Sequence, residues 1–140
     1  MISEADVVLF IVDLKSGITN EDILISYELK KNKVNIILVV NKVDNFDLVK
    51  NNSDFYSLGF GYPFFISAKS KYNIFNLSNY FIKMCSNDWY KECFFLVHYK
   101  HLNEKYFNFK IKFSIIGSAN VGKSTLINKI KGENRVIVSD

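Results

Sequence analysis

A segment near the C-terminal end carries a phosphate-binding pattern. Residues 117–124 match G-x-x-x-x-G-K-[ST] without a mismatch. The matched residues and the threonine that follows them are Gly117, Ser118, Ala119, Asn120, Val121, Gly122, Lys123, Ser124 and Thr125. Glycines let such a loop curl its N–H groups around phosphate oxygens, and the following helix adds partial positive charge. We expect Lys123 to reach the β- and γ-phosphates and the Ser124 hydroxyl to ligate Mg²⁺.

A second segment carries groups that suit one edge of a guanine base. Asn41-Lys42-Val43-Asp44 directly follows an apolar run. Guanine presents two N–H donors on one edge and adenine does not, so a site built on the Asp44 carboxylate would reject adenine, which leaves that acceptor unpaired. We expect Asn41 to tie this loop to its neighbours and the Lys42 stem to cover the base. Alone, N-K-x-D is a weak signal, because these are common turn residues.

A third segment, Ser67-Ala68-Lys69, follows the next apolar run. We expect the backbone N–H of Ala68 to donate to the guanine O6 atom, since small residues permit that close approach. The tripeptide alone has little value. Together with the two segments above it predicts a guanine-nucleotide site rather than an adenine one.

Alternating strand and helix patterns must position these segments. Short continuous apolar runs predict strands over 7–12, 36–40, 63–66 and 111–116, and their continuity indicates a sheet buried on both faces. A capping signal at Thr19 and Asp22 predicts a helix over 20–32. Helical spacing of apolar residues predicts another over 73–84, and a third follows the phosphate loop. The pattern is that of an α/β P-loop NTPase with three layers and a mostly parallel, incomplete sheet, whose ligands sit at the carboxyl ends of the strands.

The order of the motifs is unusual, because N-K-x-D precedes the phosphate loop. One explanation is that residues 1–85 are the end of one GTPase domain, 86–110 a linker and 111–140 the start of a second. The other is a circularly permuted ribosome-assembly GTPase. In that order the strand over 111–116 can add to the sheet of residues 1–84 and bring Asp44 and Lys123 to a single nucleotide.

Several segments resemble the bacterial tandem GTPase family known as Der or EngA. The most distinctive is D-F-Y-S-L-G-F-G over 54–61, with R-V-I-V-S-D over 135–140. The other resembling segments are 4–13, 17–22, 38–44, 66–68, 120–128 and 132–133. The resemblance does not cover the aromatic, basic stretch over 86–110.

The resemblance implies two GTPase domains in one protein, GTP hydrolysis, and a role in assembly of the large ribosomal subunit, with rRNA as partner. It implies GTP or GDP and Mg²⁺ as ligands, and K⁺ held in part by Asn120. Ala119 stands where the family commonly has proline, and Asn73 where it has glycine. The 140 residues contain no D-x-x-G motif, so we expect the chain by itself to be inactive. A truncated remnant without catalysis is a further alternative.

Composition excludes several other classes of protein. With 49% hydrophobic and 23% charged residues the profile is globular rather than disordered. No apolar run is long enough to span a bilayer, and because the first residues are acidic we expect no signal peptide. Two cysteines suggest no disulfide framework, which favours a cytoplasmic location. The net charge of +4 comes from 17 lysines and one arginine beside 16 asparagines, a bias that AT-rich codons would also produce.

Overall fold

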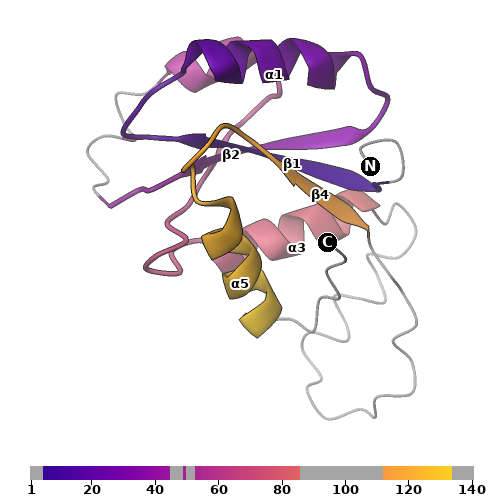
Figure 1. The fold of residues 1–140 in the computed structure, drawn as a ribbon. Helices are drawn as coiled ribbons and strands as arrows, with labels where there is room; N and C mark the ends of the chain where they lie inside the picture. Colours follow the sequence, from indigo (N-terminus) through magenta and orange to yellow (C-terminus); the bar gives the residue numbers. More distant parts are fainter. Residues whose placement is uncertain (1–4, 45–48, 50–52, 86–111, 134–140) are drawn as a thin grey trace.

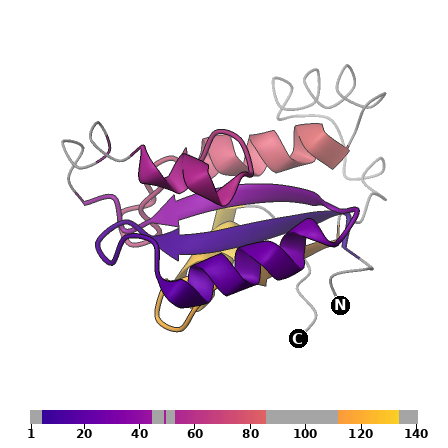
Figure 2. The ribbon, with the colours of Figure 1, turned by 90° about the horizontal axis from the view of Figure 1, so that it is seen from above.

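One parallel sheet of four strands forms the centre of the molecule (Figure 1). The computed structural model describes residues 5–44, 49, 53–85 and 112–133. The strands are β1 (Val7–Asp13), β2 (Asn35–Asn41), β3 (Phe64–Phe65) and β4 (Phe113–Ile116), in the spatial order β3-β2-β1-β4. All three pairings are parallel, so the carboxyl ends of the strands meet at one edge. Figure 2 shows the arrowheads of β1 and β2 at the same end.

Helices cover both faces of this sheet. The described helices are α1 (Asn20–Lys30), the 3-10 helix η2 (Asp54–Leu58), α3 (Ile74–Cys85) and α5 (Lys123–Glu133). α1 lies on one face, and α3 and α5 lie on the other (Figure 1). The predicted fold class, an α/β P-loop NTPase fold with a parallel sheet, is confirmed.

The position of β1 between two layers of helices explains why its sequence is continuously apolar. Val7, Leu9 and Ile11 pack in one core with residues of α3 and α5. Val8, Phe10 and Val12 pack in a second core with residues of α1 and η2. All six side chains are fully buried. A strand with helices on both faces has no solvent side, so the period of two disappears.

The strand before the phosphate loop completes the same sheet as the N-terminal segment. β4 pairs with β1 from Val7↔Phe113 to Phe10↔Ile116. Leu126 and Ile130 of α5 are fully buried in the core that contains Val7, Leu9 and Ile11. The strand before the phosphate loop thus adds to the sheet of the N-terminal segment, as the order of the motifs allowed. The division of the chain into parts of two domains stays a prediction, and the proposed linker over 86–110 lies outside the described residues.

The elements differ from the sequence expectations mainly at their ends. The first helix ends at Lys30 rather than at residue 32, and its N-terminus has the expected capping box between Thr19 and Asp22. The strand expected over 63–66 is only Phe64–Phe65. η2 was not expected, because its formation depends on burial of Phe55 and Leu58 rather than on a local pattern. The apolar residues Val136, Ile137 and Val138 lie outside the described part. Among the helices that the structure describes, none combines the length and apolarity needed to cross a bilayer.

Replacement of Leu126 by alanine tests whether α5 belongs to the core of the N-terminal segment. Leu126 is fully buried against β1 residues, so Leu126→Ala should lower the free energy of unfolding by about 2–5 kcal/mol. Urea titration followed by circular dichroism measures this loss. Leu24→Ala is the matched control, because Leu24 is 66% exposed on α1. Equal stability of the two variants would show that α5 does not pack on this sheet.

Candidate functional site

Three loops meet at the carboxyl edge of the sheet, and the side chain of Asn41 joins them. Asn41 is the last residue of β2 and is 2% exposed. Its Nδ2 atom donates to the carbonyl oxygen of Val121 at 2.8 Å. Its Oδ1 atom accepts from the backbone N–H of Ala68 at 2.9 Å. The N-K-x-D loop, the S-A-K loop and the phosphate loop are therefore bonded through one amide, the tying role that the sequence predicted for Asn41.

Two glycines let the phosphate loop approach its neighbours closely. At Gly117 a Cβ atom would collide with the carbonyl oxygen of Ile11 in β1. Gly122 has φ +99°, and a Cβ atom there would collide with Nδ2 of Asn41. Asn120 also has a positive φ, of 62°, which asparagine tolerates better than most residues. The glycines of this motif thus place its backbone against β1 and β2.

The lysine and hydroxyl groups of the phosphate loop lie at the start of α5. Nζ of Lys123 donates to the carbonyl oxygens of Gly117 at 2.8 Å and Ser118 at 2.6 Å. Its ammonium group therefore lies over the loop that the sequence expects to hold phosphates. Ser124 and Thr125 are exposed in the first turn of α5, and Ala119 and Asn120 are exposed at the tip of the loop.

The lysine of N-K-x-D pairs with an aspartate that the sequence analysis did not single out. Lys42 has φ +67°, and its Nζ atom lies 2.6 Å from Oδ2 of Asp13, the last residue of β1. Asp13 is 7% exposed. Because it ends a central strand at the same edge as Asn41, the rule that ligands sit at strand ends was a signal that could have found it.

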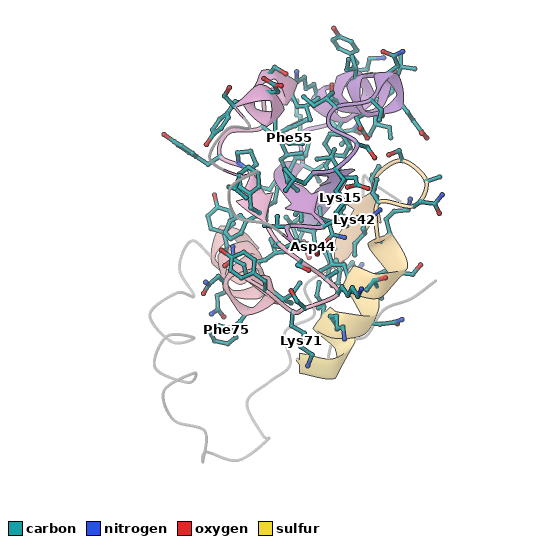
Figure 3. All side chains as sticks on the ribbon, turned by 90° about the vertical axis from the view of Figure 1, so that its left-hand side faces the viewer. Lys15, Lys42, Asp44, Phe55, Lys71 and Phe75 are labelled. Atoms are coloured by element: carbon teal, nitrogen blue, oxygen red, sulfur yellow. The ribbon has the colours of Figure 1, made fainter. Side chains whose placement is uncertain are left out.

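The carboxylate predicted to read the base is also paired. Nζ of Lys15 lies 2.6 Å from Oδ2 of Asp44, and the two side chains are 55% and 47% exposed. The hydrogen bond from Lys15 lowers the pKa of Asp44, with smaller contributions from the charge of Lys69 and from a hydrogen bond of Ser67. The same hydrogen bond raises the pKa of Lys15. Both groups are therefore charged at neutral pH. Figure 3 shows Lys15, Lys42 and Asp44 close together.

The N-terminus of α1 also reaches the phosphate loop. Oδ2 of Asp22 accepts from Thr19, while its Oδ1 atom accepts from the Ser118 hydroxyl at 3.1 Å. Asp22 was expected only as a helix-capping residue. It borders a polar cavity of about 520 Å³ between the β1–α1 loop and the phosphate loop. The cavity is lined by Asp13, Ser16, Thr19, Asn20, Glu21, Asp22, Lys42, Ser118, Ala119, Asn120 and Val121.

The structure thus brings the predicted base-reading and phosphate-binding segments to one edge of the sheet. Ser67 and Ala68 are buried beside Asn41, and Lys69 is exposed. The N–H of Ala68, expected to donate to guanine, donates to Asn41 in this structure. Within the described ranges, no group of three or more His, Cys, Asp or Glu side chains is arranged to hold a metal ion. The exposed Ser124 hydroxyl in the first turn of a helix fits a Mg²⁺ ion that takes its other ligands from phosphate and water.

Known proteins match both halves of the chain. Residues 112–140 match the family described as 50S ribosome-binding GTPase. The chain is 40% identical over 140 residues to GTPase Der of Staphylococcus saprophyticus. It is 43% identical over 139 residues to GTPase Der of Macrococcus caseolyticus, and 39% identical over 139 residues to that of Staphylococcus epidermidis. Each alignment covers 99% of this chain but 29% of the relative's length.

These alignments run continuously from the base-reading segments through the phosphate loop. They favour the tandem GTPase family over a circularly permuted GTPase, the alternative that the motif order left open. The observed fold agrees, since it is a parallel α/β sheet with a phosphate loop between a strand and a helix. Over the part of these relatives that it spans, the chain is therefore similar in sequence to GTPase Der proteins.

Proposed function

We propose that this chain binds a guanine nucleotide at a single composite site. The base would lie on the loops after β2 and β3, and the phosphates on the loop after β4. The pair of hydrogen bonds made by Asn41 to Val121 and Ala68 supports this most strongly. They join the base-reading and phosphate-binding segments directly, although Asn41 and Val121 are 80 positions apart in the chain.

Each group at the edge of the sheet has a proposed role. Asp44 accepts the two N–H groups of the guanine edge, and Ser67 orients that carboxylate. The stem of Lys42 covers one face of the base, and exposed Lys69 adds positive charge beside it. The N–H of Ala68 would reach guanine O6 while it also donates to Asn41, in a three-centre hydrogen bond.

The phosphate loop would hold the diphosphate. Backbone N–H groups of residues 117–124 surround the phosphates, and Lys123 turns from the loop carbonyls toward the β-phosphate. Ser124 would be a ligand of Mg²⁺, which neutralises phosphate charge when bound, and Asn120 would contribute to a K⁺ site. The exposure of both side chains supports these roles.

We also propose that the complete protein hydrolyses GTP in assembly of the large ribosomal subunit in the cytoplasm, in contact with rRNA. The description of the family that matches residues 112–140 supports the link to the 50S subunit. The 140-residue chain alone should bind nucleotide without turnover. It contains no D-x-x-G motif, and phosphoryl transfer depends on groups that position water and Mg²⁺ at the γ-phosphate.

Replacement of Asp44 by asparagine tests the base specificity. Asp44→Asn exchanges one carboxylate oxygen for an amide donor, so the affinity for GDP should fall by about 10- to 100-fold. Isothermal titration calorimetry with GDP and ADP measures the preference. Asp54→Asn is the control, because Asp54 is an exposed aspartate in the first turn of η2, outside the site. Equal affinities of the unaltered chain for GDP and ADP would contradict the proposal.

Replacement of Gly122 by alanine tests whether the two halves form one site. The new Cβ atom would displace the Asn41 amide and so separate the base loops from the phosphate loop. GDP affinity should fall by about tenfold or more, because one or two buried hydrogen bonds would be lost. Gly61→Ala is the matched control: Gly61 also has a positive φ, of 77°, but its Cβ would meet nothing within 4 Å. The idea fails if the two variants bind GDP equally.

The absence of turnover is a separate prediction. Phosphate release from GTP by the purified 140-residue chain should not exceed that of its Lys123→Ala variant. A malachite green assay in Mg²⁺ and K⁺ buffer compares the two. Release that depends on Lys123 and proceeds over many turnovers would show that the chain carries its own catalytic groups.

A further inference from the structure

We propose that Lys15 is a further residue of the base subsite, whose ammonium group competes with the guanine edge for the carboxylate of Asp44. The inference rests on the proposed guanine-nucleotide site. Nζ of Lys15 lies 2.6 Å from Oδ2 of Asp44, a short charge-assisted hydrogen bond. The two residues are 29 positions apart and come from the loops after β1 and β2 (Figure 3).

A buried aspartate directs Lys15 toward this carboxylate. The backbone N–H of Lys15 donates to Oδ1 of Asp13 at 2.9 Å. The other oxygen of Asp13 accepts from Nζ of Lys42 at 2.6 Å. Asp13 thus fixes the start of the β1–α1 loop against the N-K-x-D segment. Two ion pairs therefore lie near each other here, and of these two the pair of Lys15 and Asp44 is the more exposed.

The competition follows from the number of donors on the base. Guanine approaches Asp44 with two donors, one for each carboxylate oxygen. In this proposal the ammonium group of Lys15 takes the approach to Oδ2 that the second guanine donor needs, so guanine displaces it. Hypoxanthine lacks the 2-amino group and can pair through one N–H with Oδ1 while Lys15 keeps Oδ2. Lys15 therefore weakens the binding of a two-donor base more than that of a one-donor base.

The exposure of the pair sets the size of the effect. The side chains of Lys15 and Asp44 are 55% and 47% exposed, and ion pairs with such access to water are weak. Displacement of Lys15 should lower guanine affinity by about two- to fivefold, without preventing binding. Lys15 thus sets how tightly the base is held and how readily it leaves.

The test compares nucleotides with two, one and no donors at this edge. We would titrate GDP, IDP and ADP into the 140-residue chain and its Lys15→Met variant by calorimetry. Lys15→Met keeps the stem and removes the charge, so GDP affinity should rise about two- to fivefold while IDP affinity stays unchanged. Lys15→Arg should behave as the unaltered chain. Lys31→Met is the matched control, because it removes another exposed 2.6 Å ion pair, with Glu28.

The outcomes separate this inference from the proposed function. Unchanged or weaker GDP binding by Lys15→Met would overturn the competition and leave the guanine site in place. Equal tightening of GDP and IDP would also overturn it, because it would indicate an effect of charge on the whole nucleotide. Failure of both chains to bind GDP would overturn the proposed function, and the role of Lys15 with it.

Discussion

The side-chain amide of Asn41 connects segments that no local interaction could bring together. This amide donates to the phosphate loop and accepts from the S-A-K loop, and Asn41 is only 2% exposed. A buried amide without partners is costly, so these two hydrogen bonds constrain all three loops at once. The chain meets this constraint with glycine at position 122, where any side chain would occupy the place of the Asn41 amide.

The sheet provides the frame on which this interaction depends. β1 is buried on both faces and pairs with β2 on one side and β4 on the other. Because the strands are parallel, their last residues meet at one edge of the sheet. Asp13 ends β1 there, Asn41 ends β2, and the phosphate loop begins after β4. The position of β4 beside β1 therefore brings two separated sets of motifs to the same edge of the sheet.

Two ion pairs lie at this edge of the sheet. Asp13 is matched by Lys42, and Asp44 by Lys15. The more buried pair organises the loops, because removal of one partner would leave a buried charge. The exposed pair can exchange partners at little cost, so it suits a position where a ligand must enter and leave.

Much of this arrangement follows from local patterns in the sequence. The phosphate loop, N-K-x-D, the apolar strands and the Thr19–Asp22 capping box depend on residues close together in the chain, and each was predictable. The role of Asn41 was also predicted, because a side chain at a strand end has neighbouring loops within reach. The 3-10 helix η2 was missed, since burial of Phe55 and Leu58 by distant residues stabilises it.

Some contacts could not be predicted from the sequence, because they join residues from different elements. These are the ion pairs of Lys15 and Lys42 and the contact of Asp22 with Ser118. The sequence by itself determined which chemical groups are present and at which strand ends they lie. Only the tertiary structure decided that β4 adds beside β1. The continuous apolar run of β1 predicts burial on both faces, but no local pattern encodes which distant strand pairs with its edge.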